Sequence, residues 1–129
     1  MNADSLVLAS DILHKGIAGL QAAYLFGSRA TGTSRADSDW DIGILCPRMK
    51  SMDLASLSGQ LSSVLGGACD LVDLKRASVS LRTEVLRTGR AFMAPDALAL
   101  ARFEMDSLTE YQNLNEHRKA ILRDLGMAA

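Results

Sequence analysis

The residues of this 129-residue chain that are best suited to chemistry lie in the stretch GSRATGTSRADSDWD, from Gly27 to Asp41. The apolar run before it, Ala22–Phe26, is rich in β-forming residues and ends at a glycine, which is typical of a buried strand that enters a tight turn. Gly27 lets a ligand approach the backbone closely. Ser28 adds a hydroxyl and a backbone N–H at the start of a short helical turn, where unpaired donors favour a phosphate. This half of the stretch therefore predicts a triphosphate-binding turn.

Two carboxylates form the second half of the stretch, because Asp39 and Asp41 stand at the head of another apolar run, Trp40–Leu45. Side chains alternate along a strand, so the two acids share one face while Trp40 points into a core on the other. Like charges on a half-buried face are unfavourable unless something offsets them, and a divalent cation is the simplest candidate. Gly43 adds no bulk to the carboxylate face, and we expect it to leave room for a ligand.

A third carboxylate is expected from the next strand, Ala68–Leu74, which carries both Asp70 and Asp73. These acids are three residues apart, so they point to opposite faces unless the strand is bulged, and only one of them can join the site. Asp70 lies within the strand among apolar neighbours, whereas Asp73 lies near its end and is more easily solvated. We favour Asp70 and keep Asp73 as the alternative.

Helices are expected between and after these strands, from the spacing of apolar residues and from their caps. The expected elements, besides the three strands, are helices at about 4–15, 53–65 and 79–88, the third capped by Ser78, a short strand at 91–93, and a long amphipathic helix at about 96–125. This order predicts an α/β fold with a small mixed sheet flanked by helices. We expect a single domain over residues 1–129, with a catalytic unit of about 1–94 followed by the long helix.

The composition limits the class of function. The 14 basic and 15 acidic residues nearly balance, so no basic field recruits nucleic acid, and direct nucleic-acid binding is not expected. No signal peptide and no membrane span is recognisable. Cys46 and Cys69 lack the spacing of metal ligands and are expected to be buried thiols, which suits a cytoplasmic protein. His14 and His117 lie on expected helices without a nucleophile nearby, and we expect them to serve surface or packing roles.

The signature GS-x10-DxD, with Ser38 directly before the first acid, resembles that of the polymerase-β-like nucleotidyltransferase superfamily. The short chain is similar in particular to the minimal nucleotidyltransferases that serve as antitoxins in HEPN/MNT toxin–antitoxin pairs. The resemblance continues through CDLVDLKRAS, from Cys69 to Ser78, and through LRTEVLRTGRAFMA after it, so it extends to about residue 94. Trp40 departs from the family, in which a small aliphatic residue usually stands between the two acids.

The resemblance implies in-line attack of an acceptor hydroxyl on the α-phosphate of ATP, with pyrophosphate as the leaving group. It implies two Mg²⁺ ions bridged by Asp39 and Asp41. Asp70 would complete the coordination of one of these ions and take the proton from the acceptor.

The same resemblance implies a set of residues that hold the nucleotide. The backbone at Gly27 and Ser28, with the Ser28 hydroxyl, would hold the β- and γ-phosphates. Arg29 is the favoured residue for neutralising their charge, and Arg35 is the alternative. Ser38 joins this set through its place in the signature.

The leading hypothesis is an antitoxin enzyme that transfers AMP to a tyrosine hydroxyl of a cognate HEPN ribonuclease toxin. A protein acceptor suits a chain in which only residues 95–129 follow the catalytic unit. One alternative is an antitoxin that acts by binding and occlusion alone, although a vestigial site would have no reason to keep its charges together. The other is a nucleotidyltransferase for an aminoglycoside-like small molecule, although the mixed charges of the C-terminal segment offer no acidic patch for a polycation.

Overall fold

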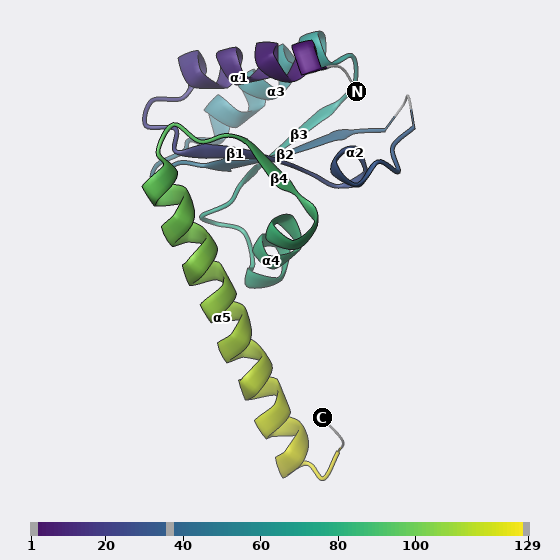
Figure 1. The fold of residues 1–129 in the computed structure, drawn as a ribbon, viewed down its shortest axis with the longest axis vertical. Helices are drawn as coiled ribbons and strands as arrows, with labels where there is room; N and C mark the ends of the chain where they lie inside the picture. Colours follow the sequence, from purple (N-terminus) through teal and green to yellow (C-terminus); the bar gives the residue numbers. More distant parts are fainter. Residues whose placement is uncertain (1–2, 36–37, 128–129) are drawn as a thin grey trace.

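The computed structural model describes residues 3–35 and 38–127 of the chain. The elements of this part are, in order, α1 (Ala3–Gly16), β1 (Ala22–Phe26), α2 (Ser28–Thr31), β2 (Trp40–Leu45), α3 (Ser51–Leu65), β3 (Cys69–Asp73), α4 (Val79–Thr88), β4 (Arg90–Met93) and α5 (Ala97–Asp124). The strands form one sheet in the order β3-β2-β1-β4 (Figure 1). β1 runs antiparallel to β2 and β4, while β2 and β3 are parallel. The expected mixed sheet within an α/β fold is confirmed.

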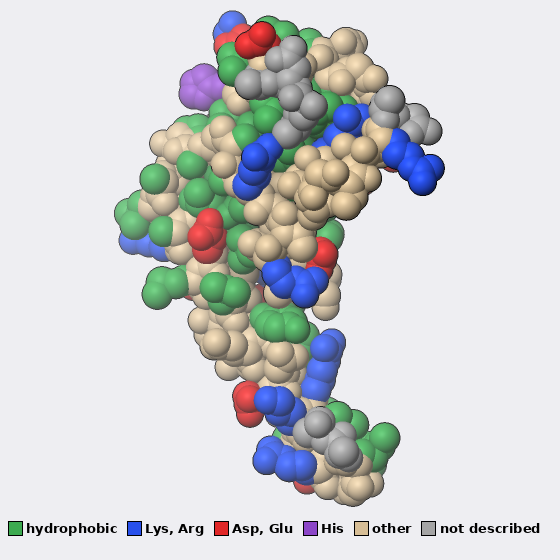
Figure 2. Space-filling view, turned by 45° about the vertical axis from the view of Figure 1, so that its right-hand side comes forward, with side chains coloured by type: hydrophobic (Ala, Val, Ile, Leu, Met, Phe, Trp, Pro, Cys, Tyr) green, Lys and Arg blue, Asp and Glu red, His purple; other side chains and the backbone are tan. Residues whose placement is uncertain are grey.

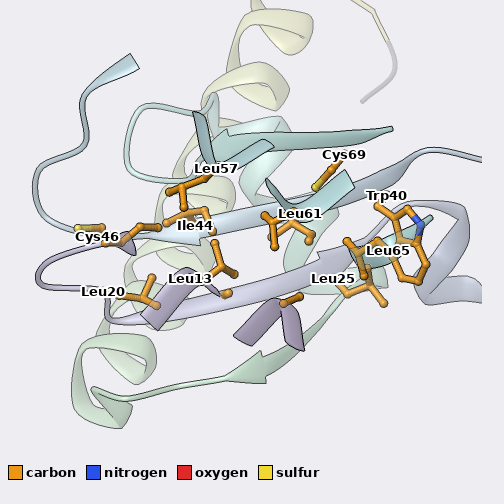
Figure 3. Close-up of a cluster of buried hydrophobic side chains, with 14 of the residues drawn as sticks. Leu13, Leu20, Leu25, Trp40, Ile44, Cys46, Leu57, Leu61, Leu65 and Cys69 are labelled. Carbon is orange, nitrogen blue, oxygen red and sulfur yellow. The ribbon is translucent and has the colours of Figure 1, made fainter. Parts of the chain in front are cut away.

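One face of the sheet is covered by α1 and α3, which Figure 1 shows side by side above the strands. The inward residues of β2 and β1 pack there against leucines of both helices, and Figure 3 shows part of this cluster. Leu13 of α1 and Leu57 and Leu61 of α3 are buried in it. Each such leucine contributes about 1.5–3 kcal/mol through burial, so this layer holds β2 firmly in place.

The other face of the sheet is covered by α4 and by the first part of α5. Val85 of α4 and Phe103 of α5 pack there against Tyr24 and Phe26 of β1. The hydroxyl of Tyr24 donates a hydrogen bond to Glu104 at 2.5 Å. Burial and this bond to a carboxylate raise the pKa of Tyr24, so the phenol stays protonated and α5 is tied to the sheet.

Local sequence signals explain where most helices begin and end. The Ser78 side chain accepts the N–H of Leu81 at 3.1 Å, as the predicted cap of α4 should. Asp96 accepts the N–H of Ala99 at 3.0 Å and caps α5 in the same way. α3 begins two residues earlier than the predicted Asp53, at Ser51, and ends at Gly66 in the left-handed conformation.

The long helix α5 leaves the sheet after its first few turns, as Figure 1 shows. Its first half is anchored by the buried side chains of Phe103 and Ser107 and by an ion pair between Glu110 and Arg82 of α4. Further along, Ile121 and Leu125 are 45% and 67% exposed. In Figure 2 hydrophobic, basic and acidic side chains lie next to one another over this projecting part. The outer half of α5 therefore presents a mixed surface.

Candidate active site

The site is built where β1 ends beside the start of β2, at the end of the sheet next to α2 (Figure 1). The antiparallel register pairs Phe26 with Asp41, so the turn after β1 lies directly next to this acid. Gly27 adopts φ 73°, a conformation that other residues rarely take. A Cβ at this position would also overlap the Asp41 carboxylate. Two separate constraints therefore require glycine here.

A single helical turn follows, and the predicted helix start at Ser28 is confirmed, because α2 begins there. The first helical bonds run from the N–H groups of Ala30 and Thr31 to the Gly27 carbonyl, at 3.1 and 3.3 Å. Ser28 precedes these bonds and lies at the start of the helical turn. The turn can thus offer donors to an anion beside the carboxylates.

The register between β2 and β3 separates the two candidates for the third acid. Asp41 pairs with Asp70 in the parallel ladder, and paired residues project from the same face. Asp73 pairs instead with Ile44, whose side chain is buried in the cluster under α1 and α3. The Asp73 carboxylate accepts the N–H of Lys75 at 3.1 Å. The expectation that Asp73 is the more solvated acid is wrong, because its side chain is only 12% exposed whereas Asp70 is exposed. The structure therefore brings Asp70 to Asp41 and leaves Asp73 on the other face.

Electrostatic repulsion among the acids is visible at Asp41. Its pKa is raised, first by burial and then by the negative charges of Asp70 and Asp39. Asp39 and Asp70 are exposed. Burial and the charges of Asp70 and Asp41 also raise the pKa of Cys69 to about 12, so this thiol stays neutral. The site is thus a place of concentrated negative charge.

A divalent cation fits this donor set. Carboxylate oxygens on one face are the ligands that Mg²⁺ prefers, and a cation would offset the repulsion that raises the pKa of Asp41. Within residues 3–35 and 38–127, no three His, Cys, Asp or Glu side chains converge on a common coordination point. Like charges without a cation between them are expected to stay apart in this way.

Ser38, which precedes Asp39, is contacted from two sides. Its hydroxyl accepts the N–H of Arg35 at 2.7 Å. The Arg29 Nη2 donates to the Ser38 carbonyl at 2.8 Å, and its guanidinium lies 4.3 Å from the centre of the Trp40 ring. Arg35 is exposed. Positions 36 and 37 of the signature lie outside the described residues.

Trp40 points to the face opposite the acids, as predicted, and is only 3% exposed. Figure 3 shows its ring beside Leu25 and Leu65. The prediction that Gly43 leaves room for a ligand is wrong. A Cβ at Gly43 would lie 2.8 Å from Cδ2 of Leu74, so this leucine already fills the space. The carboxylate face is therefore closed to a ligand at Gly43.

The remaining sequence predictions concern the cysteines and histidines. Cys46 and Cys69 are free and buried, as expected. His14 and His117 are both exposed on helices, which confirms the surface role expected for them. The sequence reasoning missed the stacking of Arg29 on Trp40, although a large aromatic residue between the two acids was a signal of an unusual contact. No helix in the described part of the chain could cross a membrane.

Comparison with known proteins agrees with this geometry. Residues 10–97 match the family model described as polymerase beta, nucleotidyltransferase. The protein adenylyltransferase MntA of Shewanella oneidensis is 34% identical over 118 residues, which are 88% of this chain and 82% of that protein. A crystal structure of a toxin–antitoxin complex with AMP-PNP matches with a TM-score of 0.80 and 31% identity, over 97% of this chain and 98% of that one. An MNT antitoxin in complex with the tri-AMPylated Shewanella oneidensis HEPN toxin matches with a TM-score of 0.77 and 28% identity, over the same shares of 97% and 98%.

Proposed function

This chain belongs to the polymerase beta nucleotidyltransferase family, and from this premise we propose that it is an antitoxin enzyme that transfers AMP from ATP to a tyrosine of a cognate HEPN ribonuclease toxin. The relatives that support this proposal include a protein adenylyltransferase and an antitoxin bound to an AMPylated HEPN toxin. The observation that carries it is the placement of Asp41 and Asp70 on one face, directly beside the Gly27 turn.

The three acids Asp39, Asp41 and Asp70 would hold Mg²⁺. The oxygen donors of these side chains and the raised pKa of Asp41 support this assignment. When bound, Mg²⁺ neutralises the phosphate oxygens and makes the acceptor hydroxyl more acidic. Asp41 is fixed by the strand ladders on both sides, whereas Asp39 and Asp70 are exposed and free to turn toward a ligand. This combination suits acids that must adapt to a nucleotide as it enters.

The residues of the Gly27 turn would bind the triphosphate. The backbone at Gly27 and Ser28 and the Ser28 hydroxyl would contact the β- and γ-phosphate oxygens, and Gly27 allows their close approach. The toxin hydroxyl attacks the α-phosphorus, the new O–P bond forms as the bond to pyrophosphate breaks, and Asp70 accepts the hydroxyl proton. Ser38 would support this site by holding the chain directly before Asp39 through its bonds with Arg35 and Arg29.

The decisive experiment is the intact mass of the purified toxin after incubation with this protein, ATP and Mg²⁺. We expect mass increases in steps of one AMP, with the modified residue mapped to tyrosine. The Asp39→Asn variant is the matched control and should leave the toxin mass unchanged. An unshifted toxin mass with the wild-type protein, together with full neutralisation by Asp39→Asn, would instead identify an antitoxin that acts by occlusion.

We place part of the toxin interface on the outer half of α5. Ile121 and Leu125 are exposed there, and the helix continues well past its last contacts with the sheet. Cutting the chain after Phe103 would remove Ser107 and Glu110, which anchor α5 to the rest of the fold. Truncation after Leu114 is therefore the sharper test.

The truncation after Leu114 should weaken co-purification with the toxin by at least about tenfold in affinity, because several apolar contacts are lost. The unfolding midpoint should change little, since the anchors remain. Unchanged affinity of the truncated chain would move the interface to another surface. We further propose that the whole chain acts as a single domain in the cytoplasm, where Cys46 and Cys69 stay reduced.

A further inference from the structure

Asp39 and Asp41 are held in place by different means. Asp41 lies inside β2, where it pairs with Phe26 on one side and with Asp70 on the other. Asp39 precedes the first residue of the strand, so no ladder pairing holds it. Its position depends on its two chain neighbours, Ser38 and Trp40.

Arg29 contacts both of these neighbours from the helical turn on the other side of the site. Its Nη2 bonds the Ser38 carbonyl at 2.8 Å, and its guanidinium stacks on the Trp40 ring with 4.3 Å to the ring centre. A planar guanidinium can stack flat on the ring and donate in its own plane to the carbonyl, whereas a compact lysine ammonium cannot stack in this way. Trp40 itself is fixed by its buried ring and by the hydrogen bond that its backbone N–H donates to the Ala68 carbonyl at 2.8 Å.

The direction of the Arg29 side chain follows from these contacts. The Trp40 ring packs on the face opposite Asp41, in the cluster beneath α1 and α3 (Figure 3). The Arg29 guanidinium that stacks on it therefore lies on the Trp40 side of the strand, away from the face that carries the acids. This placement favours a structural use of the guanidinium over direct contact with phosphates.

We propose that Arg29 is a positioning residue that sets the distance between the phosphate-binding turn at Gly27 and the metal ligand Asp39. The inference rests on the proposed function, because it assumes that this end of the sheet binds metal and triphosphate. Arg29 lies in the first turn of α2, so its bridge to Ser38 and Trp40 links α2 to the segment that leads into Asp39. Loss of the bridge leaves Asp39 tethered only by a loop, which raises the cost of ordering it when the metal binds.

The test is a double-mutant cycle on ligand binding, which needs neither toxin nor transfer. Calorimetry measures the affinity for Mn²⁺ alone and for Mn²⁺ with AMP-PNP in Arg29→Met, Trp40→Leu and the double variant. Each single variant should bind both probes about tenfold more weakly, and the double variant no more weakly than the worse single one. Arg29→Lys should recover little of the loss. Arg48→Met, which removes the same charge at the far end of β2, is the matched control and should bind as the wild type does.

Trp40 is the only tryptophan of the chain, so its fluorescence reports the contact directly. Arg29→Met should shift the emission and Arg48→Met should not. Trp40→Phe is the conservative comparison for Trp40→Leu. If Trp40→Leu does not fold, the affinities of Arg29→Met, Arg29→Lys and Arg48→Met for Mn²⁺ alone carry the test. The indole N–H has no hydrogen-bond partner among the described residues, so phenylalanine keeps the stacking and should keep affinity within about threefold of the wild type.

Several results would overturn the inference. A direct phosphate ligand would lose affinity for Mn²⁺ with AMP-PNP but not for Mn²⁺ alone, and Trp40 variants would then bind normally. Losses that multiply in the double variant would show that the two residues act independently. If the double-mutant cycle shows coupling but the protein never adds AMP to its toxin, the proposed function is refuted and the inference stands. Absence of any Mn²⁺ or AMP-PNP binding by the wild type would refute both.

Discussion

On the face of β2 that packs beneath α1 and α3, Trp40, Ile42 and Ile44 are buried among leucines, whereas the other face of the same strand carries Asp41 in line with Asp39. The first face gains free energy from burial, about 1.5–3 kcal/mol for each large side chain. The second gathers like charges and raises the pKa of Asp41. The strand thus separates folding from chemistry by the alternation of its side chains, and substitutions on the two faces should have different consequences.

Removal of a metal ligand from the carboxylate face should have the largest effect on activity. Asp39→Asn or Asp41→Asn should lower AMP transfer by on the order of 10³-fold, because the transition-state charge loses its compensation. The fold should survive, since neither side chain packs in the core. Steady-state transfer to the toxin, with circular dichroism as the check on folding, measures both effects. A variant that keeps more than about a tenth of the activity would remove that acid from the catalytic role.

The third acid of the site comes from β3, where Asp70 and Asp73 lie on opposite faces. Asp70→Asn should lower the rate by on the order of 10²-fold, because it lies beside Asp41 and is proposed to take the proton. Asp73→Asn is the matched control on the opposite face, next to Ile44, and should stay within a few-fold of the wild-type rate. The two variants are compared side by side in the same assay. A larger loss for Asp73→Asn would contradict the assignment of the site to the Asp41 face.

Two glycines with positive φ that flank α2 separate the contact with Asp41 from the general cost of a positive φ. Gly27 has φ 73° and ψ −158° and Gly32 has φ 77° and ψ 13°, and only at Gly27 would a Cβ meet the Asp41 carboxylate. Alanine should cost roughly 1–2 kcal/mol of stability at Gly32, which is left-handed, and about 1–3 kcal/mol at Gly27, whose backbone lies in a region that essentially only glycine adopts. Only Gly27→Ala should also lower transfer, by about tenfold or more, because it displaces Asp41. Urea unfolding and transfer kinetics of both variants test this, and equal losses of activity would show that the contact with Asp41 is irrelevant.

Features that depend on local periodicity could be predicted from the sequence. The alternation along β2 correctly placed Trp40 in the core, and the odd spacing of Asp70 and Asp73 correctly put them on opposite faces. The caps at Ser78 and Gly66 gave the ends of two helices. In each case the deciding interaction joins residues only a few positions apart, so the sequence contains the information directly.

Features that depend on contacts between distant residues could not be predicted. Leu74 fills the space beside Gly43 because of how the chain leaves β3, which no local pattern reveals. Arg29 reaches Trp40 across a loop, and its extended side chain could equally have turned toward a phosphate. Tyr24 and Glu104 are 80 positions apart, so the anchoring of α5 becomes visible only in the folded chain.

The smallest expected effect is the pH dependence of stability that the carboxylate face produces without metal. The pKa of Asp41 in the folded protein lies above its ordinary value of 3.8, so in the window just above 3.8 the folded chain binds more protons than the unfolded chain. The unfolding free energy contributed by this group therefore falls as the pH rises through that window. Asp41→Asn lacks this titration and should be more stable than the wild type at about pH 7. The difference in unfolding free energy between the two proteins should narrow toward about pH 4.5. Urea unfolding in EDTA at both pH values measures this difference. A difference in unfolding free energy that stays constant or widens in acid would show that the neighbouring carboxylates do not destabilise the charged form of Asp41.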